Sequence, residues 1–302
     1  MIRFALFGFI VVLLVGCSPQ AQNTADQLHI DGIELIDDGR WEEARLLYTR
    51  IIEEHPPEDT DALARAHMNR AIALFELGQT EEAVADETVV IELAPSDVNL
   101  LAQAHLNRGR EYGFLDMLDE SLADAEAVIA LQPGDTDLLA GAHVNRAVLR
   151  RDLGRPEDAV ADLTVALDLD PEPDVHMAAS VYRSELLAEL GRYEAAIKDA
   201  TVAINLDTNK RFVVRAYLVR GVSLTAVEQL EPGLDDLSAA IELRPEDQTL
   251  LARAHLARAA TLFFLGRETE AISDLELVTT LLPSTDEFHQ IAVELLTELE
   301  PS

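Results

Sequence analysis

Four histidines recur at one position of an internal repeat, and recurring histidines are the first side chains to test for metal chemistry. They are His67, His105, His143 and His255. Two imidazoles on one zinc ion must each place a nitrogen within about 2.1 Å of it. Equivalent side chains on stacked helices lie roughly one helix-packing distance apart, about 8–10 Å. We therefore predict no metal site, and we expect these imidazoles to pack between helices.

Arginine and aspartate recur as six pairs, and the two members of each pair are 16 residues apart. The pairs are Arg70 and Asp86, Arg108 and Asp124, Arg146 and Asp162, Arg183 and Asp199, Arg220 and Asp236, and Arg258 and Asp274. A guanidinium donates two parallel hydrogen bonds to one carboxylate, and buried charges are normally paired. The pattern therefore predicts structural ion pairs. The alternative is a row of arginines that binds an anionic ligand, but arginines neutralised by their own aspartates have little charge left for one.

The sequence contains no recognisable catalytic constellation. It has no His-Glu-x-x-His, no Gly-x-Ser-x-Gly and no glycine-rich phosphate loop. Acidic pairs such as Glu81 and Glu82 are typical of solvated helix starts rather than of acid–base catalysis. We therefore expect neither an enzyme nor a cofactor.

The chain is strongly acidic, with 23 Lys and Arg against 56 Asp and Glu and a formal net charge of −33 at pH 7. This charge repels nucleic acid and anionic lipid headgroups, so we exclude nucleic acid as a partner. An acidic surface suits basic partners or a salty environment, and a GC-rich genome produces the same bias. Because 48% of the residues are hydrophobic, the acidity does not indicate disorder.

Cys17 is the only cysteine, so an intramolecular disulfide is excluded. The run from Phe4 to Val15 has no polar side chain, and it is too short for a bilayer core, which needs about 20 apolar residues. An apolar run of this length, ending in the small residue Gly16, is typical of a secretory signal peptide. The cysteine that follows resembles the lipobox of bacterial lipoproteins.

The lipoprotein resemblance implies that residues 1–16 are removed and that the thiol of Cys17 is acylated. It places the mature protein in the bacterial cell envelope, anchored by lipid, and we expect the outer membrane with the chain facing the periplasm. Residues 17–26 are polar and aperiodic, and they are expected to form a flexible tether.

The elements that must position the recurring side chains come from seven copies of a repeat with a period of 37 to 39 residues. Five copies share a glycine that is followed five residues later by alanine: Gly39, Gly78, Gly154, Gly191 and Gly266. Weaker copies carry Asp116 and Glu228 at this glycine position. Proline follows 17 residues later, except where Thr208 replaces it. A fixed period of this size is typical of a solenoid.

Each repeat predicts two helices, because apolar residues keep helical spacing on both sides of the glycine position. Leu63, Ala66 and Leu74 show this spacing before Gly78, and Val84 and Val90 continue it afterwards. Glycine ends the first helix because it tolerates a left-handed backbone. Proline is expected to end the second helix because it has no N–H to donate.

These positions resemble the tetratricopeptide repeat over residues 27–283. The resemblance implies an all-α fold, an α-solenoid in which seven helical hairpins form a right-handed superhelix. Residues 284–302 contain one more amphipathic segment, which predicts a C-terminal capping helix and about fifteen helices in total. The period exceeds the usual length of about 34 residues, and we expect the surplus to extend the first helix of each repeat at its N-terminus.

Asparagine precedes the arginine in three consecutive repeats, at Asn69, Asn107 and Asn145. In superhelices of this family the matching position looks onto an inner groove, and in some members it binds the backbone of an extended peptide. A primary amide suits this role because it offers both a donor and an acceptor. We interpret the three residues as peptide-groove candidates. The alternative is that they are water-facing amides without a ligand.

The sequence thus predicts a membrane-anchored scaffold that binds segments of other cell-envelope proteins, in envelope, secretion or pilus assembly. One alternative is a structural lipoprotein that forms homo-oligomers, and a less favoured one is an enzyme subunit with a cryptic site. The identity of the partner and the oligomeric state stay open.

Overall fold

The computed structural model describes residues 24–54 and 59–299, which form fifteen helices and no strand. The helices are α1 (Thr24–Asp37), α2 (Trp41–Glu54), α3 (Thr60–Glu76), α4 (Thr80–Leu93), α5 (Val98–Phe114), α6 (Leu118–Leu131), α7 (Thr136–Asp152), α8 (Pro156–Asp168), α9 (Pro173–Glu189), α10 (Tyr193–Leu206), α11 (Lys210–Ala226), α12 (Leu230–Glu242), α13 (Gln248–Phe264), α14 (Glu268–Leu281) and α15 (Glu287–Leu299). The predicted all-α fold and its helix number are confirmed. Cys17 lies outside the described residues, and α1 begins three residues before the predicted start of the first repeat.

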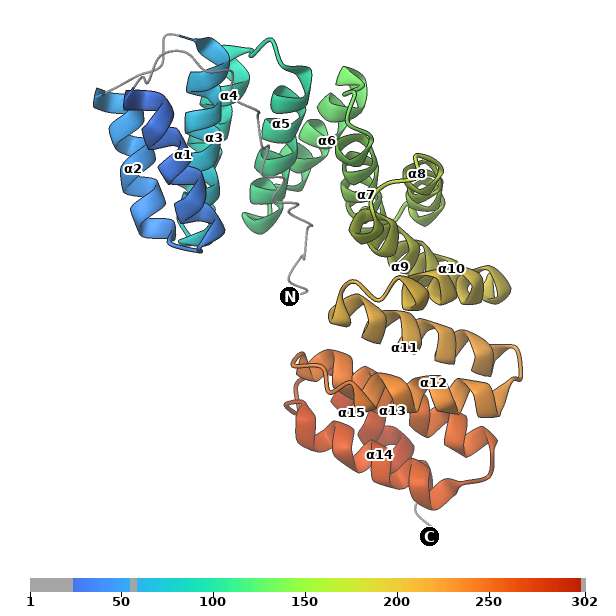
Figure 1. The fold of residues 1–302 in the computed structure, drawn as a ribbon. Coiled ribbons are helices and arrows are strands. Elements are labelled where there is room, and N and C mark those ends of the chain that lie inside the picture. Colours follow the sequence, from blue (N-terminus) through green and yellow to red (C-terminus); the bar gives the residue numbers. More distant parts are fainter. Residues whose placement is uncertain (1–23, 55–58, 300–302) are drawn as a thin grey trace. The chain divides into compact units, whose positions relative to one another are not determined.

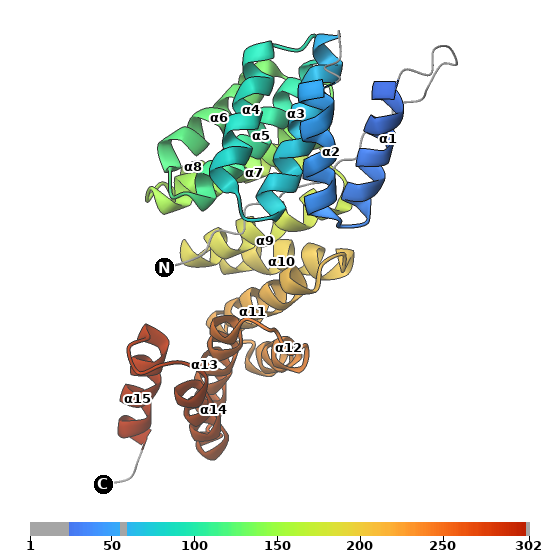
Figure 2. The same cartoon turned by 90° about the vertical axis from the view of Figure 1, so that its left-hand side faces the viewer.

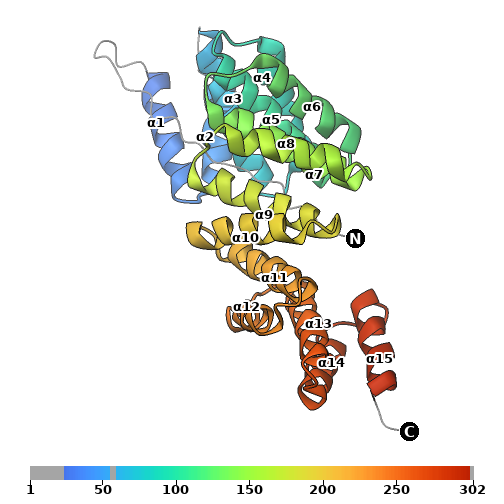
Figure 3. The same cartoon turned by 90° about the vertical axis from the view of Figure 1, so that its right-hand side faces the viewer.

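The chain divides into two compact units, with unit 1 ending at Leu149 and unit 2 beginning at Arg150, inside the last turn of α7. In unit 1, α3, α4 and α5 lie side by side as successive layers of one stack (Figures 1 and 2). In unit 2, α13, α14 and α15 do the same (Figure 3). The right-handed twist expected for the whole stack stays a prediction.

The two helices of a repeat take different places in the stack. Within each unit, first helices of successive repeats contact one another, as α3 contacts α5 in unit 1 and α11 contacts α13 in unit 2. Second helices of successive repeats in one unit make no such contact within the described ranges. The first helices therefore line the narrower side of each stack, which we call the inner face.

The turn at the glycine position has one conformation throughout. Gly78 has φ +77°, its N–H donates to the carbonyl of Phe75, and the next N–H donates to that of Leu74. Asp116 and Glu228 adopt the same left-handed conformation, with φ of +61° and +62°. The two weaker repeats therefore keep the turn although they lack its glycine.

The second helix ends before the proline rather than at it. Ala94 and Gln132 have φ of +47° and +49°, and each is the residue between its helix and the proline. Asp207 does the same in the repeat that has Thr208 in place of proline. A left-handed residue thus ends these helices, and the proline only prevents them from continuing. At the end of α14, by contrast, Leu282 before Pro283 is extended.

The first helices from α3 onward have 17 residues, whereas the second helices have 13 or 14. This agrees with the extension that the long period predicts. Asp59 and Asp97 cap α3 and α5 by accepting hydrogen bonds from backbone N–H groups of the first turn. Such a cap satisfies donors that have no partner inside the helix.

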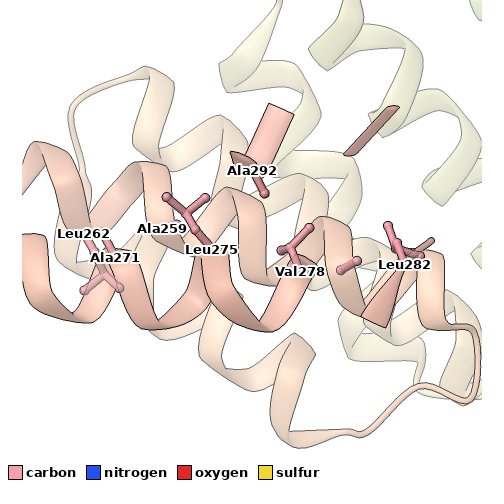
Figure 4. Packing of buried hydrophobic residues seen from close by; sticks show 8 residues of the cluster. Ala259, Leu262, Ala271, Leu275, Val278, Leu282 and Ala292 are labelled. Atoms are coloured by element: carbon pink, nitrogen blue, oxygen red, sulfur yellow. The ribbon is translucent and has the colours of Figure 1, made fainter. Parts of the chain in front are cut away.

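The open end of unit 2 is covered by α15. Its Ala292 is fully buried against a cluster that includes Leu262, Leu275 and Val278 from the last repeat (Figure 4). Phe288 and three leucines of α15 pack around the same cluster. A solenoid needs such a cap because its last repeat has no neighbour to bury its apolar side.

Candidate functional site

Five of the six predicted Arg–Asp pairs are bidentate ion pairs in the structure. In each, Nε of the arginine donates to Oδ2 of the aspartate and Nη2 donates to Oδ1, as in Arg108 and Asp124 at 2.9 and 2.8 Å. The others are Arg70–Asp86, Arg183–Asp199, Arg220–Asp236 and Arg258–Asp274. Arg146 and Asp162 belong to different units, and their pairing stays a prediction. Within unit 2, Asp162 accepts a hydrogen bond from Nη1 of Arg150 at 2.7 Å.

The third nitrogen of each guanidinium reaches the preceding repeat. Nη1 of Arg108 donates to the hydroxyl of Thr88 at 3.1 Å, and Arg183 reaches Thr164 at 3.2 Å. The same contact joins Arg70 to Thr49, Arg220 to Thr201 and Arg258 to Ser238. This link between repeats was not predicted, although a hydroxyl residue ten positions after the glycine position in these repeats indicates it.

The repeated histidines belong to the same network. Nδ1 of His67, His105 and His255 lies 2.7–2.8 Å from Oδ1 of the aspartate in its own repeat. Because an ionised carboxylate only accepts hydrogen bonds, Nδ1 is the nitrogen that carries the proton. The histidines were expected to pack between helices, but their bond to aspartate was missed. The part of the chain that the structure describes contains no cluster of three or more residues able to hold a metal ion.

Burial and pairing act in opposite directions on these aspartates. Burial raises the pKa of Asp86, but the hydrogen bonds from Arg70 and His67 outweigh it and hold the pKa below its ordinary value. The pKa of Asp274 is lowered through the same balance of burial against Arg258 and His255. Both carboxylates are therefore ionised at neutral pH, as an ion pair requires.

The asparagines differ from the exposed amides expected at the groove. Asn107 is only 6% exposed; its Nδ2 donates to Oε1 of Glu87 and its Oδ1 accepts from Gln103, both at 2.8 Å. Asn69 is partly buried and donates to the hydroxyl of Tyr48 at 3.0 Å, and Asn145 is buried. The fold itself uses two of the three amides, and peptide binding by these residues stays a prediction.

A family model described as tetratricopeptide repeat matches residues 32–98 and 144–209. These two segments contain tetratricopeptide repeats. No curated protein matches it. Among the described residues, no helix has the length and hydropathy needed to span a bilayer.

Solved structures extend this tetratricopeptide likeness along the chain. The APC/C hetero-tetramer Cut9–Hcn1 is 14% identical with a TM-score of 0.67, and covers 91% of this chain and 49% of that one. This chain therefore spans about half the length of that relative. The apo form of RapI is 9% identical, with a TM-score of 0.68 and coverage of 92% and 82%. A tetratricopeptide repeat protein from Parabacteroides merdae is 14% identical, with a TM-score of 0.58 and coverage of 91% and 98%. At these identities the likeness shows the fold alone.

On the inner face of unit 1, the first helices α3 and α5 present an aromatic pair. Phe75 of α3 and Phe114 of α5 meet edge to face, with ring centroids 5.0 Å apart. The guanidinium of Arg110 lies 4.3 Å from the centroid of Phe75. Phe114 is 54% exposed, so one large apolar ring is available to a partner.

On the inner face of unit 2, a part-buried ion pair links two first helices. Arg215 of α11 donates to both carboxylate oxygens of Glu185 on α9, at 2.8 and 2.5 Å, and stacks 4.6 Å over the ring of Tyr182. Burial raises the pKa of Glu185, but Arg215, Arg151 and Arg253 together hold it below its ordinary value. The inner face of unit 2 is therefore firmly cross-linked between first helices.

Proposed function

We propose that this protein is a lipid-anchored scaffold of the bacterial cell envelope, and that its inner face binds segments of other envelope proteins. Tetratricopeptide-repeat proteins generally act as protein-interaction scaffolds, and their fold is typically non-enzymatic. The anchor is Cys17, and the location is the outer membrane on its periplasmic side. The process served is the assembly of an envelope, secretion or pilus complex.

The observation that carries the proposal is the exposed aromatic ring on the inner face. Phe114 lies two residues before the glycine position, and Phe264 occupies the same position in unit 2, where it is 65% exposed. Large exposed rings are costly to leave in water and are enriched where proteins bind one another. The Arg–Asp–His network behind them fixes the first helices, so the face is already ordered before a partner arrives.

The net charge of −33 selects the kind of partner. A basic segment is attracted to this surface, and its lysine or arginine side chains gain a further contact by stacking on the ring of Phe114. Binding should weaken as the salt concentration rises, because salt screens exposed charges beyond about 10 Å at 0.1 M.

We expect a pull-down from detergent-solubilised envelopes to recover a partner with the wild-type chain and to lose it with Phe114→Ala. The matched control is Leu46→Ala on α2, because Leu46 is equally exposed (53%) but lies on a second helix of the same unit. Equal recovery by the two variants would place the binding surface elsewhere. An empty pull-down with a discrete oligomer by light scattering would favour the structural homo-oligomer instead.

A further inference from the structure

Two carboxyl groups of unit 1 occupy positions that are apolar core elsewhere in the repeat. Glu87 of α4 and Glu111 of α5 are both fully buried. At the position of Glu87, three other repeats have Leu163, Leu237 and Leu275; at the position of Glu111, two others have Leu149 and Leu186. Burying a carboxylate instead of a leucine is costly unless the charge is paired or the group is neutral.

The two carboxyl groups have far fewer hydrogen bonds than such burial requires. Oε1 of Glu87 accepts from Asn107, but its Oε2 and both oxygens of Glu111 have no hydrogen-bond partner in the described part of the chain. The neighbouring Arg110 is 8% exposed, and its Nε is buried without a partner as well. The guanidinium of Arg110, which stacks on the ring of Phe75, therefore faces both carboxyl groups.

Four charged side chains lie around Glu87 and Glu111 and influence their ionisation. They are Asp86 of α4, Asp124 of α6, and Arg108 and Arg110 of α5. Arg108 is already bound to Asp124, and Arg110 is also faced by Glu76 from α3.

Burial is the largest influence on the pKa of Glu87 and of Glu111. It raises the pKa of Glu111 to about 8 against the pull of Arg110 and Arg108, and it raises that of Glu87 well above the ordinary value, with Glu111 adding to the effect. Glu185 in unit 2 is the contrast, since a bidentate arginine keeps that part-buried carboxyl ionised.

We propose that Glu87 and Glu111 form a proton-binding site behind the inner face of unit 1, and that proton release loosens the packing of α4 against α5. Because Arg110 faces both carboxyl groups and stacks on the ring of Phe75, the same event disorders the partner surface. The effect on binding rests on the proposed function, whereas the effect on stability does not.

The direction of the pH effect follows from linkage. A carboxyl whose pKa is higher in the folded than in the unfolded chain contributes stability that is complete below the unfolded value, about 4.3. That stability is lost as the pH rises toward the folded value, near 8 for Glu111. Within this window each released proton raises the unfolding constant about tenfold per pH unit.

Amide hydrogen exchange of the full chain at pH 5 to 8.5 tests the site, after correction for the intrinsic pH dependence of exchange. We expect the opening constant of α4 and α5 to rise with pH in the wild type and to rise less steeply in Glu111→Gln, where only Glu87 still releases a proton. The matched control is Glu185→Gln, which removes an ionised carboxylate and should weaken α9 and α11 equally at every pH in this range. Parallel pH profiles for wild type and Glu111→Gln would overturn the proposal.

A second measurement covers the case in which Glu111→Gln does not fold. Carbon-13 NMR of the side-chain carboxyls in the wild type should show two groups that titrate far above the others, and Glu111→Leu should remove one of them. If every glutamate titrates near pH 4.5, the site does not hold a proton. Neither measurement uses a partner, so failure of the proposed scaffold function would be seen separately.

Discussion

At the residue scale, five of the six repeated arginines use all three guanidinium nitrogens. Two hold the aspartate of the same repeat, and the third reaches a hydroxyl group of the preceding repeat. In three repeats the aspartate also accepts a hydrogen bond from a histidine, so one carboxylate holds two side chains of the first helix. A lysine could not reproduce this geometry, because its ammonium lacks the planar fork.

Removal of one arginine should therefore damage the fold rather than binding. In Arg108→Ala, the buried Asp124 keeps only its contact with His105, and we expect a loss of about 3 kcal/mol in the free energy of unfolding of unit 1. Arg108→Lys should lose less, because a positive charge remains. Urea denaturation measures both. Wild-type stability of Arg108→Ala together with lost partner binding would mean that these arginines bind a ligand instead.

At the scale of the helical hairpin, the left-handed turn is kept even in the two repeats that lack its glycine. Glycine adopts the left-handed backbone without strain, whereas a residue with a Cβ is strained there by roughly 1–2 kcal/mol. Aspartate tolerates this region better than glutamate does. Glu228, with φ +62°, is therefore the most strained of the seven turn residues.

We expect Glu228→Gly to stabilise unit 2 by about 1 kcal/mol, because it removes this strain, although it also makes the unfolded chain more flexible. The matched opposite change is Gly154→Ala, which should destabilise the same unit, since the added Cβ meets no neighbour but the left-handed φ of +72° is unfavourable. Thermal melting of both variants decides the matter. Destabilisation by Glu228→Gly would show that the glutamate side chain contributes more than its backbone strain costs.

At the scale of the whole molecule, a chain of charge −33 cannot be held at an anionic membrane by its own surface. Attachment therefore depends on the acyl groups expected on Cys17. Two acyl chains bind a bilayer far more firmly than one, at about 0.8 kcal/mol per buried methylene group.

The Cys17→Ala variant should take up no labelled fatty acid, and it should become soluble or keep its signal peptide. The measurement is radiolabelled palmitate incorporation followed by membrane fractionation. The control is Ser18→Ala, which keeps the cysteine and should be labelled like the wild type. If the wild-type chain takes up no label, the proposed lipid anchor is wrong.

Local signals in the sequence determined the helical architecture. The helical spacing of apolar residues, the glycine position and the 16-residue Arg–Asp interval each act within one hairpin, so they are visible without the fold. The Arg–Asp interval placed five ion pairs correctly because both partners lie on the two helices of one repeat.

Only the tertiary structure decided which polar groups are buried. Glu87 and Glu111 look like ordinary helix-surface acids in the sequence, because their burial arises where α4 packs on α5. The same packing turns the amide of Asn107 inward, and the contact between repeats gives five of the arginines their third partner. Burial and the hydrogen bonds it enforces depend on which helices meet, and this is not encoded within any single helix.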